Sequence, residues 1–282
     1  MTTPSTEALR SAREFRLALF EAPPRGVAGE RLGRGTGSSL EFQDRRTYAI
    51  GDDVRHLDWR AFARTDQLLV RQYREEILPR VEIFLDVSRS MAVDPVKAQA
   101  ALDIVAVLAG AGKGDGFQVE IALAGSRPEI VDFDRFAREG ASFEGRESWD
   151  RCLPLALAAL RRGSMRVLVS DFLFPHDAAE WVRPLAAHAG GLALIQVLSA
   201  FDREPTEGVA LRLTDAETDA SRDLVLDRRT VERYRERRER LTDGLEKECR
   251  RAGARFVAVE AETGIQALCR GRFVPAGLLT IA

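Results

Sequence analysis

The fold is decided by one stretch of the chain, which reads Val81-Glu82-Ile83-Phe84-Leu85-Asp86-Val87-Ser88-Arg89-Ser90-Met91. Its unbroken apolar run predicts a β-strand that is buried on both faces. Asp86, Ser88 and Ser90 follow at alternate positions, just beyond that run. A carboxylate and two hydroxyls are hard oxygen ligands, which suit Mg²⁺, Mn²⁺ or Ca²⁺ better than zinc. The stretch therefore predicts a divalent-cation site at the end of a central strand.

Strands and helices alternate through the rest of the chain, which predicts an α/β fold with a doubly wound, mostly parallel sheet of the Rossmann type. A short turn at 125–128 makes the strands on either side of it antiparallel, and so predicts one antiparallel edge strand. The further predicted strands are 117–123, 129–133, 165–170, 192–198 and 255–259, and the predicted helices are 94–111, 149–161, 177–188 and 228–252.

A second carboxylate, Asp171, follows the buried strand Met165–Ser170. In doubly wound sheets, binding sites lie beyond the carboxyl ends of the strands, where the strand order reverses. If the strands that end near Asp86 and Asp171 are neighbours across that reversal, the two carboxylates converge on one cleft. Taken alone, Asp171 is equally well explained as a turn residue or a helix cap.

The composition is that of an ordinary globular protein, with 45% apolar and 30% charged residues among 282. A net charge of −2 argues against nucleic acid as a partner. We expect no membrane span, because the most apolar segment carries Asp103 and is typical of a core helix. Cys152, Cys249 and Cys269 match no zinc spacing and indicate thiols in a reducing compartment. With no signal-peptide pattern, a cytoplasmic location is expected.

The first part of the chain divides into a predicted helix, Ser5–Ala22, a glycine-rich loop, 25–39, and a block rich in charge and aromatic residues, Leu40–Glu76. In the block, Asp52 or Asp53 can cap a short helix, and 68–73 reads as a strand. We expect Asp and Arg residues to fix the block to the main domain through ion pairs, with Trp59 largely buried. The predicted organisation is thus an N-terminal extension, 1–79, packed on a main domain, 80–282.

The chain also resembles known protein families. The run Asp86-Val-Ser88-Arg-Ser90 is similar to the Asp-x-Ser-x-Ser signature of the metal-ion-dependent adhesion site in von Willebrand factor type A domains. The N-terminal block resembles the bacterial domain-of-unknown-function 58 family, in which such a block precedes a von Willebrand A-like domain. The matching residues of the block are Glu41-Phe42, Arg46-x-Tyr48, Gly51-Asp52-Asp53-x-Arg55, Asp58-Trp59 and Ala63-Arg64.

The resemblance implies a residue-by-residue assignment of the site. Ser88 and Ser90 would bind the cation through their hydroxyls, while Asp86 and Asp171 would anchor it, in part through water. The family type adds a threonine from a loop that reads Gly145-Arg-Glu-Ser-Trp-Asp150 here. Since this loop has no threonine, Ser148 is the nearest chemical substitute, with Glu147 or Asp150 as alternatives. The implied cofactor is a divalent cation, Mg²⁺ first, with Mn²⁺ or Ca²⁺ as alternatives.

The resemblance also implies a function: a non-enzymatic protein-interaction module that works as an adaptor for a MoxR-type AAA+ ATPase or its client protein. One alternative is a metal-dependent phosphatase of the haloacid dehalogenase type with Asp86 as nucleophile. That chemistry needs a general acid two residues later, where this chain has Ser88. It also needs a lysine, which is hard to place among only three. A scaffold with a vestigial metal site is the second alternative.

Overall fold

The computed structural model describes residues 1–18, 40–49, 57–75, 80–125, 129–145, 160–208, 210–214 and 221–282. The chain forms two compact units. One joins Met1–Pro24 with Pro79–Ala282, and the other is Arg25–Leu78. The smaller unit ends at Leu78, and the first residues of the chain group with the large unit. The expected division into 1–79 and 80–282 stays a prediction.

The large unit is built on a six-stranded sheet with the order β11-β8-β7-β4-β5-β6. All neighbouring pairs in it are parallel except β5 with β6, which is antiparallel at one edge. This confirms the predicted fold class. Its strands are β4 (Arg80–Asp86), β5 (Gln118–Ala124), β6 (Glu129–Val131), β7 (Met165–Ser170), β8 (Gly191–Leu198) and β11 (Arg255–Glu260).

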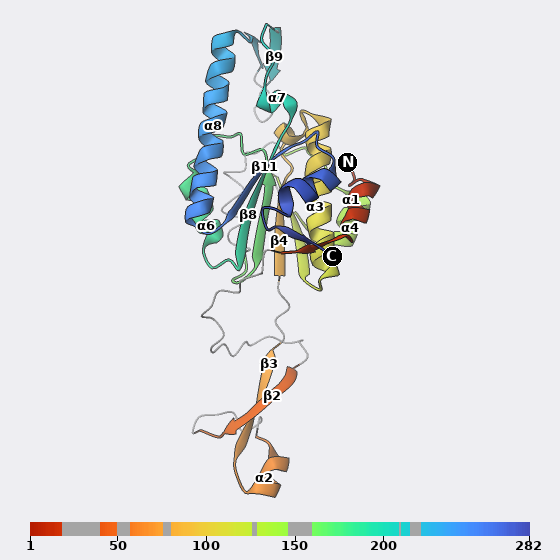
Figure 1. The fold of residues 1–282 in the computed structure, drawn as a ribbon, viewed down its shortest axis with the longest axis vertical. Helices are drawn as coiled ribbons and strands as arrows, with labels where there is room; N and C mark the ends of the chain where they lie inside the picture. The colour runs from red at the N-terminus through yellow and green to blue at the C-terminus, as the bar shows by residue number, and fades with distance from the viewer. Residues whose placement is uncertain are drawn as a thin grey trace. The chain divides into compact units, whose positions relative to one another are not determined.

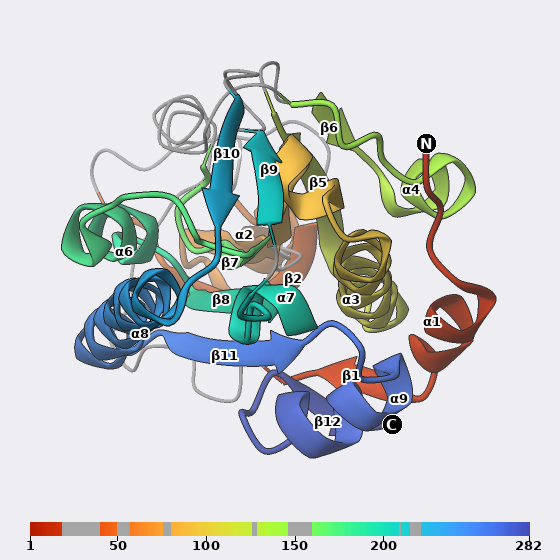
Figure 2. The same ribbon diagram turned by 90° about the horizontal axis from the view of Figure 1, so that it is seen from above.

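Helices cover both faces of this sheet (Figure 2). On one face lie α1 (Thr6–Ser11), α3 (Pro95–Gly114), α4 (Phe133–Glu139) and α9 (Ile265–Leu268). On the other lie α6 (Ala178–Ala186) and the long α8 (Arg228–Arg251). Each face has its own apolar core, and α3, rich in Ala, Val and Leu, is buried along most of its length. Burial on both faces explains why the central strands lack apolar–polar alternation.

The central elements lie where the sequence predicts them. Strand β4 ends at Asp86, β7 ends at Ser170, and α3 begins at Pro95 after the N-cap Asp94. The segment 132–139, for which we predicted no helix, forms α4 with Asp132 as its N-cap. Most of the predicted helix 149–161 lies outside the described residues.

The polar segment between β8 and α8 forms an insertion at the carboxyl end of the sheet. It contains α7 (Ala200–Arg203) and an antiparallel hairpin of β9 (Ala210–Thr214) and β10 (Ser221–Val225). Because α7 follows β8 directly, the insertion stands beyond the strand ends, beside the first turns of α8 (Figure 1). Tyr234 of α8 donates its hydroxyl to the carbonyl of Asp202, at 2.9 Å, and so fixes α7.

The predicted N-terminal helix is wrong beyond its first two turns. Helix α1 ends at Ser11, and Phe15–Leu17 forms β1, which pairs antiparallel with β12 (Leu279–Ile281). Phe15 and Leu17 are buried, whereas Arg16 between them is exposed, which is the period of a strand. The apolar positions fit a helical spacing as well, so only the pairing with a strand near the other end of the chain decides between the two.

The smaller unit is a hairpin with one helix. Strand β2 (Leu40–Thr47) pairs antiparallel with β3 (Leu69–Glu75), and α2 (Trp59–Thr65) lies between them in sequence. The cap of α2 is Asp58, whose Oδ1 accepts the N–H groups of Arg60 and Ala61, and not Asp52 or Asp53 as predicted. Trp59 is 61% exposed, so the predicted burial is not found. Packing of this block on the main domain remains a prediction, and Asp52 and Asp53 lie outside the described residues.

Within the parts of the chain that the structure describes, α3 is the single helix long and apolar enough to cross a membrane. Its most apolar window is 72% buried inside the protein, as in the core helix that the sequence predicts. Cys249 and Cys269 are free and buried, and burial raises the pKa of each thiol to about 12. Such thiols are poor nucleophiles at neutral pH.

The strand at the N-terminus gives a first testable prediction. Phe15→Ala removes a large buried side chain from the core and should lower the free energy of unfolding by about 3–5 kcal/mol. Arg16→Ala, on the exposed side of the same strand, is the matched control and should change it by less than about 0.5 kcal/mol. Denaturant unfolding measures both. Equal effects for the two variants would contradict the strand assignment.

Candidate functional site at the carboxyl end of the sheet

Two carboxylates meet at the centre of the sheet. Strand β4 pairs with β5 on one side and β7 on the other, so the strand order reverses between β4 and β7. Asp86 is the last residue of β4, and Asp171 directly follows β7. Both side chains are buried, with 2% and 3% of each residue exposed. The two strands are therefore neighbours, and the negative charge of Asp171 acts on Asp86.

Asp86 is held by hydrogen bonds on both of its oxygens. Oδ1 accepts the backbone N–H of Ser88 at 2.9 Å, and Oδ2 accepts the hydroxyl of Ser170 at 2.6 Å. Burial and the nearby charge of Asp171 outweigh these bonds and raise the pKa of Asp86 from 3.8 to about 7. Near neutral pH the carboxyl group is thus divided between its protonated and ionised forms.

The two predicted hydroxyl ligands lie side by side. Ser88 follows β4 and is buried, and Ser90 is half-buried on the 3-10 turn Arg89–Ala92. Their Oγ atoms are 2.9 Å apart and form a hydrogen bond. The Ser88 hydroxyl also contacts the carboxylate of Asp86. Asp86, Ser88 and Ser90 thus form one contiguous group of oxygens, which opens outward at Ser90.

A close backbone contact brings the next loop to this group. The N–H of Gly145 donates to the carbonyl of Val87 at 3.1 Å, and the N–H of Arg89 donates to the carbonyl of Gly145 at 3.0 Å. A Cβ at position 145 would lie 3.0 Å from the Val87 oxygen and 3.3 Å from the Cα of Ser88, which explains the glycine. The loop that carries Ser148 therefore begins beside Ser88. Ser148, Glu147 and Asp150 lie outside the described residues.

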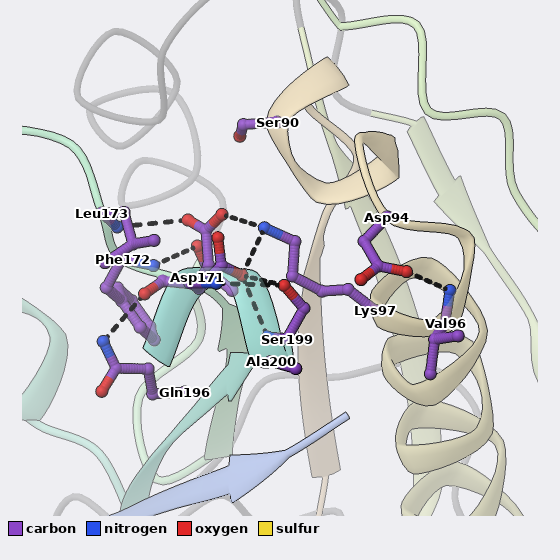
Figure 3. A network of polar contacts seen from close by, with 12 residues as sticks. Ser90, Asp94, Val96, Lys97, Asp171, Phe172, Leu173, Gln196, Ser199 and Ala200 are labelled. Carbon is purple, nitrogen blue, oxygen red and sulfur yellow. Dashed lines mark hydrogen bonds and ion pairs between the residues drawn. The ribbon is translucent and has the colours of Figure 1, made fainter. Parts of the chain in front are cut away.

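The charge of Asp171 is balanced by a lysine that the sequence analysis did not assign to the site. Lys97 extends from the first turn of α3, and its Nζ lies 2.9 Å from Asp171 Oδ2 and 3.0 Å from Asp202 Oδ2 (Figure 3). The side chain of Lys97 is only 3% exposed. Burial alone lowers its pKa, but attraction and hydrogen bonds from Asp171 and Asp202 outweigh that effect and raise it. The two carboxylates therefore favour the charged, ammonium form of this buried side chain.

Further polar contacts fix this arrangement from the neighbouring strand and helix. The side-chain amide of Gln196 on β8 donates to the carbonyl of Asp171 at 2.8 Å and accepts the hydroxyl of Thr242 on α8 at 3.0 Å. Asp202 accepts both the N–H and the hydroxyl of Ser199, each at 3.0 Å, in a capping box at the start of α7. The insertion and the site are thus joined through one continuous set of hydrogen bonds.

The backbone beside Asp171 is strained. Phe172 has φ of 51°, in the left-handed region that aromatic residues rarely adopt, and its side chain is fully buried. Such a conformation costs about 1–3 kcal/mol. It lets the N–H of Phe172 donate to the Ser170 hydroxyl at 3.0 Å, while that hydroxyl donates to Asp86. The strain is therefore tied to the orientation of the two carboxylates.

The hydroxyls of Ser88 and Ser90 suit a divalent cation, whereas the carboxylate of Asp171 already has other partners. Octahedral Mg²⁺ with oxygens at 2.0–2.1 Å places adjacent ligands about 2.9 Å apart, which matches the hydroxyls of Ser88 and Ser90. On the other side, Asp171 receives the Leu173 N–H on Oδ1 and Lys97 on Oδ2. No group of three or more His, Cys, Asp or Glu side chains arranged for a metal ion occurs among the described residues.

Asp86, Ser88 and Ser90 contact one another, and Asp171 lies close enough for its charge to act on Asp86. That the four residues hold one cation remains a prediction. The sequence analysis missed Lys97, Asp202 and Ser170. A lysine was hard to place at the site from the sequence, and Lys97 lies there. One signal for Lys97 was present: a cation in the first turn of a helix opposes the helix dipole, so it requires a specific anionic partner.

Three comparisons with known proteins complete the description of the site. The family described as "Protein of unknown function DUF58" matches residues 44–244. The uncharacterized protein Rv1480 of Mycobacterium tuberculosis and the uncharacterized protein Mb1516 of Mycobacterium bovis are similar in sequence. Each is 29% identical to this chain over 217 residues, which cover 71% of this chain and 68% of the relative.

Two solved structures are similar in part of their fold. The conserved hypothetical protein BatB from Bacteroides thetaiotaomicron has a TM-score of 0.39 and 15% identity, covering 64% of this chain and 90% of its own. An aerotolerance-related membrane protein from Bacteroides fragilis has a TM-score of 0.35 and 14% identity, covering 60% of this chain and 99% of its own.

The raised pKa of Asp86 predicts a dependence of stability on pH. The folded protein takes up a proton at Asp86 that the unfolded chain does not bind between about pH 4 and pH 7, so this stabilisation is lost as the pH rises through 7. Asp86→Asn keeps the shape and cannot ionise. The stability of the variant relative to the wild type should therefore increase by about 2 kcal/mol or more between about pH 5 and about pH 8.

Denaturant unfolding in the presence of a chelator measures this difference. The comparison of the two proteins at each pH cancels the titration of all other groups. A difference in unfolding free energy that stays constant between the two pH values would contradict the raised pKa.

Proposed function

Because the chain belongs to the DUF58 family, we propose that it is a protein-interaction module whose recognition surface is the carboxyl end of the sheet around Ser88 and Ser90. The observation that carries the proposal is the hydroxyl pair, 2.9 Å apart, beside the buried carboxylate of Asp86. Hydroxyls contribute no charge, so a divalent cation held there is incompletely neutralised. An acidic side chain of a partner then supplies the missing charge and ligand.

The surroundings of the hydroxyl pair support a protein partner. Val93 and Val96 are 72% and 45% exposed on the turn and helix that follow Ser90, and Phe201 on α7 is 46% exposed. Exposed apolar side chains next to a polar anchor are typical of protein interfaces. All three residues belong to segments that follow the carboxyl ends of β4 and β8, the end of the sheet that carries the site.

The proposed partner is a MoxR-type AAA+ ATPase or its client protein. This part of the proposal rests on the resemblance of the N-terminal block and of the Asp-x-Ser-x-Ser run to their families. In this role the chain acts as an adaptor, and the ATPase supplies the energy of nucleotide hydrolysis.

One observation favours the phosphatase alternative more than the sequence did, namely a buried lysine at the site. However, Lys97 Nζ already contacts two carboxylates, and its side chain is 3% exposed. It is therefore not free to hold a phosphoryl group. Position 88, where a general acid is needed, holds a serine that is hydrogen-bonded to Ser90. An interaction module remains the better explanation of this geometry.

The interaction proposal predicts cation-dependent binding. The chain should bind the MoxR-type ATPase of the same organism more tightly with Mg²⁺ than with EDTA, as measured by biolayer interferometry. Ser88→Ala combined with Ser90→Ala should remove this difference, because the cation loses both hydroxyl ligands. Thermal unfolding of the double variant checks that the fold is intact.

Ser142→Ala is the matched control, since Ser142 is a partly exposed hydroxyl three residues before Gly145. It should bind the ATPase as the wild type does. Equal affinity in Mg²⁺ and EDTA, with normal binding by the double variant, would show that the carboxyl end of the sheet is not the recognition surface. The unit Arg25–Leu78 should then be tested in its place.

The same geometry predicts that the chain has no phosphatase activity. Purified protein with Mg²⁺ or Mn²⁺ should not hydrolyse para-nitrophenyl phosphate above the rate of the Asp86→Asn variant. Metal-dependent hydrolysis that is abolished by Asp86→Asn would favour the phosphatase over the interaction module.

A further inference from the structure

Lys97 holds an unusual place for a lysine. It is the third residue of α3, in the first turn of the helix, where the helix dipole disfavours positive charge. Its side chain is buried and turns away from solvent toward Asp171 and the start of α7 (Figure 3). Burying an ammonium group is costly unless it is paired and hydrogen-bonded. The position is therefore explained by the two carboxylates that Lys97 contacts.

The contact changes what Asp171 can offer to a cation. Its Oδ2 receives Lys97 Nζ at 2.9 Å, and its Oδ1 receives the Leu173 N–H at 3.1 Å. Both oxygens have a donor, and the negative charge is already balanced. A divalent cation at Ser88 and Ser90 that also uses Asp171 would meet the ammonium at short range, where like charges repel strongly.

A second carboxylate gives Lys97 an alternative position. Asp202 Oδ2 lies 3.0 Å from Nζ and belongs to α7, whereas Asp171 follows β7. Lys97 can thus leave Asp171 and keep one ion pair. This arrangement makes an exchange of Lys97 for a cation at Asp171 much less costly than the exposure of an unpaired buried ammonium.

We propose that Lys97 is the resident counter-ion of this site and competes with a divalent cation for Asp171. In the absence of the cation, Lys97 neutralises Asp171 and keeps the carboxyl end of the sheet folded. When the cation binds, Asp171 is released and Lys97 is retained by Asp202. The inference rests on the cation site of the proposed function but requires no partner protein.

Isothermal titration of Mg²⁺ into the purified chain tests this competition. Lys97→Met removes the ammonium and keeps the length of the side chain. Coupling free energies between two bound groups are typically about 1–3 kcal/mol, or about 5–150-fold in affinity. On that scale, Lys97→Met should bind Mg²⁺ at least about tenfold more tightly than the wild type. Lys113→Met is the matched control, since Lys113 lies on the same helix in an exposed ion pair with Asp134. The control should bind Mg²⁺ as the wild type does.

A second variant separates competition from net charge and serves if Lys97→Met fails to fold. Lys97→Met combined with Asp202→Asn removes one positive and one negative charge, so the net charge of the cluster equals that of the wild type. Asn can still accept the hydrogen bonds that hold α7. This variant should also bind Mg²⁺ more tightly than the wild type and should gain thermal stability from Mg²⁺.

The outcomes are distinct. Tighter binding by the Lys97 variants, with no change in Lys113→Met, supports the competition. Unchanged or weaker binding, or no binding by any variant, overturns it. Since the titration contains no partner, its result is independent of whether the ATPase binds the chain.

Discussion

The parallel pairing of β4 with β7 places two carboxylates at neighbouring strand ends, and the arrangement of the surrounding residues follows from their repulsion. The hydrophobic cores on both faces of the sheet keep water away from Asp86 and Asp171, so neither charge is screened by solvent. Two features reduce the repulsion between the carboxylates. The pKa of Asp86 is raised to about 7, and Asp171 is paired with the buried ammonium of Lys97.

Lys97 also connects the two carboxylates to the insertion between β8 and α8. Its second partner, Asp202, lies on α7, and the carbonyls of Asp202 and Arg203 receive hydrogen bonds from Tyr234 and Arg238 of α8. The position of α7 thus depends on the charge balance at the strand ends. A change at Asp171 can therefore alter the contacts at the first turns of α8, because Lys97 and α7 connect the two.

The sequence predicts the sheet and its central carboxylates because their signals are local. The apolar runs of β4 and β7 end at Asp86 and just before Asp171, and α3 starts at Pro95, directly after its N-cap Asp94. A wrongly assigned element and a missed site residue both arise where the deciding contact is far away in the sequence. Phe15 fits a helix or a strand equally, and its partner Ile281 lies at the other end of the chain. Lys97 lies 74 residues from Asp171, so only the fold shows that they meet.

Other misses have a chemical reason. Asp202 lies in a polar segment with no apolar period, so nothing in the sequence marks its carboxylate as part of the site. Asp58, and not Asp52 or Asp53, caps α2. The three aspartates are equally suitable as caps, so the sequence does not show at which of them the helix starts. Sequence patterns identify which residues can cap or bind. They do not identify which of several equivalent residues does so.

The charges at the site explain why an acidic partner would depend on a cation. With all groups ionised, Asp86, Asp171, Asp202 and Lys97 sum to a formal charge of −2, so the cluster as it stands repels a carboxylate. A divalent cation would offset this negative charge and place its own positive charge at Ser88 and Ser90, on the outward side. An approaching carboxylate then meets the cation before it meets the buried acids. If Lys97 competes with the cation as proposed, a cluster without Lys97 would hold the cation more tightly and release it less readily, so the lysine would make binding at the site reversible.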